Sequence, residues 1–286
     1  MTRVLVLGRD GMLGSMIVAV LRAVAGLDVV GAGRDGNPAL DARRDDPRAL
    51  LQALRPEWVI NALGVVAARI DAADPRSADA AIDVNGRFPH RLSRAAGDCG
   101  ARVLHVSTDG VFSGRAGPYA EDAPPDADDV YGRSKRLGEV RAAHVLNLRC
   151  SLVGPERGAP RSLLGRLLAQ PPGATVAGYA DQRWNGLTTL HFAQLCRGIV
   201  RTADAPGGVV HVVPADVVTK AQLMRLLADA YARDDIEIVA AASPAPADRS
   251  LATLDPQRNR ELWRAAGHPH PPTIEAMIRE LSRSLT

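Results

Sequence analysis

The stretch RVLVLGRDGMLGSMIV, residues 3–18, joins a run of aliphatic residues to a helix-like segment through three glycines spaced G-x-x-G-x-x-G. Glycines at such a junction permit a tight turn, a close approach of backbone amides to a pyrophosphate, and close packing of helix on strand. The stretch therefore predicts a dinucleotide-binding loop, with a purely structural tight turn as the alternative. The residues expected to contact the cofactor are Gly8, Asp10, Gly11, Met12, Leu13 and Gly14.

Beyond this stretch, short apolar runs such as WVINALG and ARVLHVS alternate with amphipathic segments. Continuous apolar runs separated by helices are typical of parallel strands that are buried on both faces. We therefore expect an α/β fold, a Rossmann-like doubly wound parallel sheet, over residues 1–150, with a long helix over roughly residues 78–99. Residues 151–286 are richer in turn formers and predict a smaller mixed α/β substrate lobe, with the option that the chain crosses back to the sheet.

Composition argues against several classes of protein. The 286 residues carry 35 Lys plus Arg and 32 Asp plus Glu, for a net charge of +3, and the arginines are interspersed with acids. No basic stripe for nucleic acid is present. Cys99, Cys150 and Cys196 are too few and too widely spaced for a disulfide framework, so we expect a reducing cytoplasm. We expect neither a membrane span nor a metal site, because long apolar runs and clustered ligand spacings are lacking.

Two further segments of the first half are expected to face the cofactor. The loop after the second strand-like run carries Arg34 where an NAD-selective acid would sit, which favours the 2′-phosphate of NADPH over NADH. A solvated arginine is the alternative. Asp41 is expected to contact the adenine or to cap a turn. Asn61, Ala62, Leu63 and Gly64 follow the third strand, where a narrow backbone passes beneath a cofactor, although Gly64 could also simply end a strand.

The segment DVYGRSKRLGE, residues 129–139, places a tyrosine four residues before a lysine. The chain holds four tyrosines and only two lysines, Lys135 and Lys220, so chance predicts roughly 0.03 such pairs. Helical spacing puts Tyr131 and Lys135 on one face. An adjacent ammonium and a cationic nicotinamide would favour the ionised phenol and lower the pKa of Tyr131 toward neutrality. The alternative to a catalytic pair is a tyrosine that packs at a helix start and a lysine that is exposed to solvent.

Ser107, Thr108 and Asp109 end the fourth strand-like run, at the sheet edge where open α/β folds bind ligands. With STDGVFSG (residues 107–114), GRDGMLG and GPYAEDAPPDADDVYGRSKRLGE, the chain resembles the dTDP-4-dehydrorhamnose reductase family of the extended short-chain dehydrogenase/reductases. LRCS (148–151), GLTT (186–189) and DRSL (248–251) are similar to sugar-nucleotide-binding members. The resemblance covers nearly the full length.

The resemblance implies a triad of Thr108, Tyr131 and Lys135. Thr108 would bind the substrate carbonyl, Tyr131 would protonate its oxygen, and Lys135 would tune Tyr131 and hold the nicotinamide ribose, with Ser107 beside the cofactor. Hydride would pass to C4 of a 4-keto-6-deoxy sugar on a nucleotide diphosphate. The expected substrate contacts are Asp109, Gly110, Val111, Arg149, Trp184 and Asn185, although the last three are also typical of structural positions.

Gly110 departs from the family, which often has an aromatic residue there, so the shape of the sugar pocket is expected to differ. A glycine at this position also argues against 4,6-dehydratase chemistry, because related dehydratases place a glutamate there. Two other functions remain: a nucleotide-sugar epimerase, and a non-catalytic NADP-binding regulatory subunit. The sequence also leaves a homodimer open.

Overall fold

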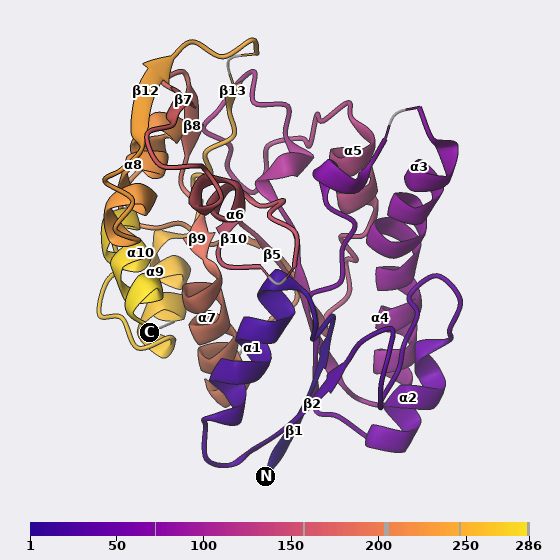
Figure 1. The fold of residues 1–286 in the computed structure, drawn as a ribbon. Helices are drawn as coiled ribbons and strands as arrows, with labels where there is room; N and C mark the ends of the chain where they lie inside the picture. Colours follow the sequence, from indigo (N-terminus) through magenta and orange to yellow (C-terminus); the bar gives the residue numbers. More distant parts are fainter. Residues whose placement is uncertain (72, 157, 203–205, 246, 285–286) are drawn as a thin grey trace.

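The computed structural model describes residues 1–71, 73–156, 158–202, 206–245 and 247–284. Its centre is a six-stranded sheet of order β10-β5-β4-β3-β1-β2, in which every neighbouring pair is parallel (Figure 1). The strands are β1 (Thr2–Leu7), β2 (Leu27–Ala32), β3 (Trp58–Asn61), β4 (Arg102–Val106), β5 (Val145–Arg149) and β10 (Gly208–His211). The expected Rossmann-like doubly wound sheet is confirmed.

Helices cover both faces of this sheet (Figure 1). One face carries α1 (Met12–Arg22) and α7 (Thr189–Thr202), which pack on each other. The other carries α2 (Pro47–Leu54), α3 (Pro75–Ala81), α4 (Phe88–Asp98) and α5 (Val130–Leu137). Short helical turns η1 (Ala67–Arg69), η2 (Ile82–Arg87) and η3 (Asp109–Val111) connect them.

Alternation along β1 shows how the sequence builds the two layers. Val4 and Val6 belong to the core formed with α1 and α7, whereas Leu5 and Leu7 belong to the core formed with α2 and α4. Successive strand side chains point to opposite faces, so a strand buried on both sides must be apolar throughout. The uninterrupted run VLVL is therefore the signature of a central parallel strand.

The remaining elements form a smaller lobe beyond the carboxyl ends of the strands and a helical layer beside α7 (Figure 1). Its short strands pair as β12 with β7, β8 with β11 and β13, and β6 with β9. These strands are β6 (Leu152–Val153), β7 (Thr175–Tyr179), β8 (Gln182–Trp184), β9 (Leu187–Thr188), β11 (Val218–Thr219), β12 (Glu237–Ala241) and β13 (Ala247–Asp248). The helices are α6 (Leu163–Leu168), α8 (Lys220–Ala230), α9 (Pro256–Ala265) and α10 (Ile274–Arg283).

Local signals fix several helix boundaries. Asp46 accepts a hydrogen bond from the backbone N–H of Arg48 and precedes Pro47 at the first turn of α2, a favourable start for a helix. Thr273 caps α10 in the same way. The buried positions of α10, Ile274, Met277, Ile278 and Leu281, follow helical spacing. Within the described ranges, none of the helices combines the length and the hydrophobicity that crossing a bilayer requires.

Three details differ from the expected organisation. The helix expected over residues 78–99 is divided by the π-helical turn η2. The run GVVHVV, assigned to the second lobe, supplies β10 and pairs with β5, so the chain does cross back to the sheet. Helix α9 was not expected at all. The boundary at residue 150 stays a prediction, because residues on both sides of it contribute to the sheet layer.

Candidate active site

The glycine loop lies where the strand order reverses, after β1 and beside β3. Gly8 has a φ of +87°, a left-handed conformation that favours glycine. A Cβ on Gly14 would lie 2.0 Å from the carbonyl oxygen of Gly8, so any side chain there would force the turn open. The reversal point of an open α/β sheet is the usual ligand crevice, and the loop has the tight geometry that this crevice requires.

The N-terminus of α1 has the form of an anion site. Gly11 is its N-cap and supplies no side-chain hydrogen bond, in contrast to α2. The first-turn amides of Met12, Leu13 and Gly14 therefore lack a capping side chain, and a phosphate oxygen is a suitable acceptor for them. Asp10 is exposed and its carboxylate lies 3.5 Å from Nε of Arg9.

Residues 61–64 lie against this loop. A Cβ on Gly8 would lie 3.1 Å from the oxygen of Ala62 and 3.2 Å from Leu63, so the two segments form a narrow passage. Asn61 is fully buried: its amide contacts Nδ1 of His105 at 3.1 Å and accepts from the backbone N–H of Leu63 at 3.3 Å. These contacts favour a role for the Asn61 side chain in shaping the segment rather than in touching a ligand.

The loop after β2 contains Arg34, which is exposed. Sequence reasoning missed Arg9, whose guanidinium crosses from the glycine loop and donates to the carbonyl oxygens of Gly31 at 2.9 Å and Asp35 at 2.6 Å. Two arginines thus border the place where the ribose of a dinucleotide would lie. Asp41 accepts from the backbone N–H of Arg43 at 2.9 Å, which favours the turn-capping reading over an adenine contact.

Thr108, Tyr131 and Lys135 converge at the carboxyl end of β4. The hydroxyl of Thr108 accepts from the backbone N–H of Gly110 at 3.0 Å and lies 3.1 Å from the carboxylate of Asp109. The buried Lys135 donates from Nζ to the carbonyl oxygen of Val106 at 2.6 Å. This bond ties α5 to the strand that carries Thr108.

Gly110 provides the space for Tyr131. A Cβ at position 110 would lie 2.8 Å from Cε1 of Tyr131 and 3.3 Å from Oγ1 of Thr108. Gly132 is equally constrained, because its Cβ would lie 2.3 Å from the oxygen of Gly110. The two glycines let the start of α5 approach η3 closely, so the phenol ring packs directly beside Thr108.

Burial governs the charge states of the pair. It raises the pKa of Tyr131 to about 12, although a hydrogen bond with Thr108 acts in the opposite direction. It lowers the pKa of Lys135 to about 8, against the opposing effect of the Glu139 carboxylate. The lowering of the phenol pKa expected from Lys135 is therefore outweighed in this structure. At neutral pH Tyr131 is a phenol, the form that can give up a proton.

Comparisons with known proteins agree with this arrangement. The family model described as the RmlD substrate binding domain matches residues 1–283. The chain belongs to the RmlD substrate-binding family. The resemblance drawn from the glycine loop and from residues 107–139 is thereby confirmed.

Three proteins that are similar to this RmlD-family chain differ in their described functions or in how closely they match it. A dTDP-4-dehydrorhamnose reductase of Streptomyces griseus is 31% identical over 278 residues, with 93% of this chain and 88% of that protein covered. Methionine adenosyltransferase 2 subunit beta of Danio rerio is 27% identical over 247 residues, covering 80% and 74%. The crystal structure of a dTDP-4-dehydrorhamnose reductase of Bacillus anthracis in complex with NADP has a TM-score of 0.80 at 18% identity, covers 99% of this chain and 100% of that chain, and supports the fold.

A buried ion pair lies behind the triad of this RmlD-family chain. Arg149 donates to both carboxylate oxygens of Glu139, each at 2.7 Å, and the two side chains are 3% and 7% exposed. Ser107 donates to the same carboxylate at 2.6 Å, and Nη1 of Arg149 lies 3.2 Å from His211. These partners favour structural roles for Arg149 and Ser107 over the substrate and cofactor contacts that the sequence predicts. Glu139 carries no motif signal beyond its place in the matching run.

Trp184, Asn185 and Val111 likewise have structural surroundings. Trp184 and Val111 are buried in apolar clusters. Asn185 donates to the carbonyl oxygen of Leu251 at 2.7 Å and accepts from its N–H at 2.9 Å. Their proposed contacts with a substrate stay predictions, and these bonds favour the structural alternative.

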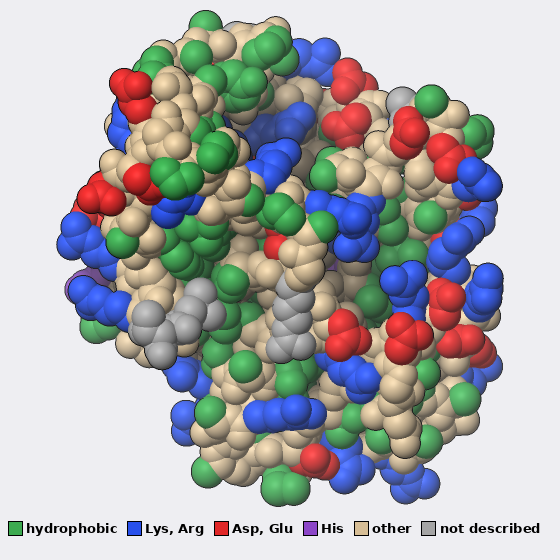
Figure 2. Space-filling model, viewed as in Figure 1, with side chains coloured by type: hydrophobic (Ala, Val, Ile, Leu, Met, Phe, Trp, Pro, Cys, Tyr) green, Lys and Arg blue, Asp and Glu red, His purple; other side chains and the backbone are tan. Residues whose placement is uncertain are grey.

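Asp109 faces a group of cations that sequence reasoning did not assign. Burial raises the pKa of Asp109, whereas Lys220 and Arg249 act to lower it. Burial lowers the pKa of Lys220. Asp109 acts to raise it, and Arg166 and Arg249 act to lower it further. In Figure 2, Lys and Arg side chains gather in a hollow between the lobe around β8 and β13 and the helix α5. Lys220 therefore lies near Asp109, the residue that follows Thr108 of the triad.

Asn85 is a further residue missed by sequence reasoning. It is fully buried in η2, where its amide donates to the oxygen of Val65 at 2.9 Å and to the hydroxyl of Ser134 at 3.1 Å, and accepts from the N–H of Val65 at 2.8 Å. It joins the segment after β3 to α5. The signal was a polar residue with a glycine, VNG, inside a helical stretch.

Proposed function

We propose that the protein is an NADPH-dependent reductase of the 4-keto group of a nucleotide-linked 6-deoxy sugar, similar to dTDP-4-dehydrorhamnose, with Tyr131 as the proton donor. The observation that carries this is the convergence of Thr108, Tyr131 and Lys135 at the same carboxyl edge of the sheet as the glycine loop. The name of the 31% identical relative supports the reaction class. The bound NADP of the similar crystal structure supports the cofactor.

The triad residues have distinct tasks in this proposal. When bound, NADPH would supply the hydride for the carbonyl carbon. Tyr131 gives its phenolic proton to the carbonyl oxygen as negative charge develops there, and the hydroxyl of Thr108 donates a hydrogen bond to the same oxygen. Lys135, held by Val106 through one of its three N–H groups, has donors left for the nicotinamide ribose.

The cofactor would lie along the crevice between the glycine loop and residues 61–64. The first-turn amides of α1 would bind the pyrophosphate. Arg34, with Arg9 beside it, would pair with the 2′-phosphate, which favours NADPH, and NADH is the weaker alternative. Loss of that preference in Arg34→Ala would support the assignment.

The cations around Asp109 are suited to bind the nucleotide diphosphate part of the substrate. Lys220, Arg249 and Arg166 concentrate positive charge in the cleft, which favours the diphosphate of a nucleotide sugar. The sugar would then extend from this group toward Thr108 and Tyr131. A homodimer stays a prediction, which light scattering on the purified protein tests.

The decisive experiment measures NADPH and NADH oxidation against a panel of nucleotide 4-ketosugars. We expect oxidation only with such a ketosugar, and a loss of turnover of about 10²–10⁴-fold in Tyr131→Phe with cofactor binding retained. Tyr231→Phe is the matched control, because the buried hydroxyl of Tyr231 has no hydrogen-bond partner among the described residues. Normal turnover of Tyr131→Phe would refute the assignment of the proton donor.

Two other outcomes would point to the alternative functions. An epimerase would convert its substrate without consuming NADPH in stoichiometric amounts. The similarity to a methionine adenosyltransferase beta subunit favours a regulatory reading as the second candidate. Tight cofactor binding, no reductase activity and a stable complex with a catalytic subunit would support that reading.

A further inference from the structure

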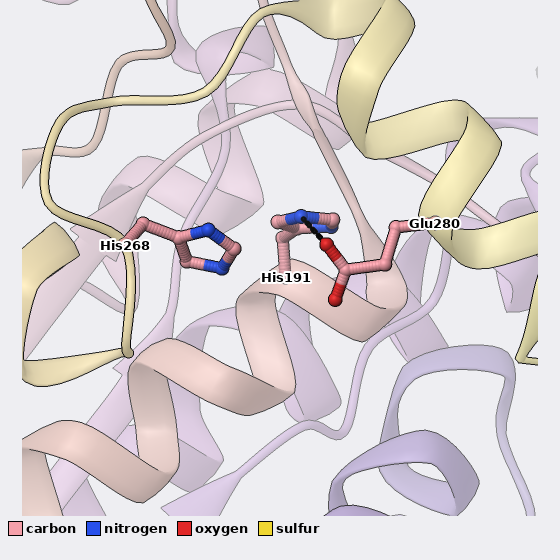
Figure 3. A group of neighbouring side chains, drawn as sticks. All are labelled: His191, His268 and Glu280. Carbon is pink, nitrogen blue, oxygen red and sulfur yellow. Dashed lines mark ion pairs between the residues drawn. The ribbon is translucent and has the colours of Figure 1, made fainter.

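Three potential metal ligands lie together on the side of α7 that contacts α10. His191 lies in α7, His268 follows α9, and Glu280 lies in α10. Their ligand atoms all lie within 4.8 Å of one another, and Nε2 of His191 is 3.2 Å from a carboxylate oxygen of Glu280. Figure 3 shows the ring of His191 between His268 and Glu280. None of the three belongs to the strand ends that form the candidate active site.

The hydrogen bonding of His191 leaves one ring nitrogen unsatisfied. The ring is fully buried, and Nδ1 lies 2.7 Å from the hydroxyl of Thr188. Nε2 has no hydrogen-bond partner among the described residues and is directed toward Glu280, but it is not aligned to donate to that carboxylate. Buried polar atoms nearly always have partners, so an unsatisfied nitrogen next to a carboxylate suggests a cation between them.

The contact between Nδ1 of His191 and the hydroxyl of Thr188 decides what Nε2 presents to Glu280. If Nδ1–H donates to Thr188, then the lone pair of Nε2 faces the carboxylate, and the two acceptors repel each other unless a cation separates them.

A glutamine orients the two outer members. Oε1 of Gln194 lies 2.8 Å from Nε2 of His268, and Nε2 of Gln194 donates to Oε1 of Glu280 at 2.7 Å. The ring of His268 also packs edge-on against the buried Trp263, with centroids 5.6 Å apart. Hydrogen bonds of this kind fix ring and carboxylate orientation in metal sites.

We propose that His191, His268 and Glu280 bind one divalent transition-metal ion, with Zn²⁺ the best match. Two neutral imidazoles and a carboxylate are typical Zn²⁺ ligands, whereas Mg²⁺ and Ca²⁺ prefer oxygen. In tetrahedral geometry, bonds of about 2.0–2.2 Å place ligand atoms about 3.3–3.6 Å apart, so side-chain rotations that bring the three ligand atoms closer complete the site. Water would fill the fourth position.

The ion would act as a structural clamp. It would tie α7, which packs on α1, to the C-terminal helix α10 and to the segment after α9. Sequence spacing gave no indication of this site, because its ligands are 77 and 12 residues apart along the chain, as their numbers show. The proposal is independent of the reductase reaction.

The test is metal binding to the full-length protein after treatment with a chelator. We expect one Zn²⁺ per chain in a calorimetric titration, and d–d absorption of a four- or five-coordinate ion when Co²⁺ is used instead. Glu280→Gln and His268→Asn should each weaken binding by about 100-fold or more, since the loss of even an outer-shell partner costs 10–100-fold. Both residues are partly exposed, so these variants should fold, which circular dichroism checks.

Matched controls lie on the same segments. His270→Asn and Glu275→Gln change an exposed histidine and an exposed carboxylate outside the group and should leave binding unchanged. Absence of a one-to-one Zn²⁺ complex in the unmodified protein would overturn the proposal. Binding that survives Glu280→Gln and His268→Asn together, or that His270→Asn reduces as much, would also overturn it.

Discussion

The substitution Glu139→Gln tests whether the ion pair behind the triad stabilises the fold. The carboxylate receives two hydrogen bonds from Arg149 and one from Ser107, and both charged side chains are almost completely buried. Removing one partner of such a pair leaves the other charge uncompensated, at a cost of about 3–5 kcal/mol. Because glutamine retains an oxygen that can accept from Ser107 or Arg149, we expect the lower end, about 3 kcal/mol.

Urea unfolding followed by circular dichroism measures this loss as a lower transition midpoint with an unchanged m value. The melting temperature should fall by about 6–12 °C, from roughly 2–4 °C per kcal/mol for chains of similar size. Glu275→Gln is the control. Nη2 of Arg279 lies 2.5 Å from Oε1 of Glu275, but both side chains are about half exposed. That exposed pair should contribute less than about 1 kcal/mol. Equal losses in the two variants would refute the reasoning.

Three further predictions concern the candidate site. In Gly110→Ala the added methyl group would push Tyr131 by about half an ångström from its 2.8 Å contact, and kcat for ketosugar reduction should fall at least about 10-fold, because small misplacements of reacting groups are costly. In Gly14→Ala the 2.0 Å approach to Gly8 should abolish NADPH binding in a fluorescence titration. The kcat/KM of the reduction should decline above about pH 8, because Lys135, with its pKa lowered to about 8, loses the charge that holds the ribose, whereas Tyr131 stays protonated.

Gly97→Ala is the common control for the two glycine variants. Gly97 lies in α4, and an added Cβ would make only an ordinary contact, 3.4 Å from His144. Activity of Gly110→Ala equal to that of Gly97→Ala would contradict the role given to Gly110. NADPH binding by Gly14→Ala would contradict the role of the glycine turn, and a kcat/KM that is flat to pH 9.5 would contradict the role of Lys135.

The layered sheet was predictable because each strand of the first half is a short, separate signal. VLVL reads as a strand buried on both faces, and the glycines after it mark the turn into α1. The place of β10 was not predictable, since pairing with β5 across about sixty residues leaves no periodic trace in either strand. The sequence also did not predict that η2 divides the helical residues 75–98. Asn85 interrupts the regular helix there through contacts with Val65 and Ser134, which are distant in the sequence.

Some residues of the candidate site could also be predicted from the sequence, whereas others could be assigned only from the fold. Thr108, Tyr131 and Lys135 lie in two short runs whose residue types already specify their chemistry. For Arg149 the sequence left two roles open, because an arginine suits a phosphate as well as a buried carboxylate. The fold shows its ion pair with Glu139, which favours the structural role. Lys220 was noticed for its scarcity but could not be placed without the fold, which brings the start of α8 near Asp109.

The placement of the two lysines has a consequence for covalent labelling. Lys135 and Lys220 are the only lysines of the chain. Lys135 is buried, Lys220 is partly exposed near Asp109, and burial lowers the pKa of each. An amine reacts in its neutral form, so the partly exposed Lys220 should be acylated at a lower pH than an ordinary lysine. The other 33 basic residues are arginines, which amine-reactive dyes do not modify. Such a dye would therefore report occupancy of the cleft, with little background labelling beyond that of the terminal amine. A nucleotide sugar should shield Lys220, whereas the buried Lys135 should stay unlabelled with or without NADPH.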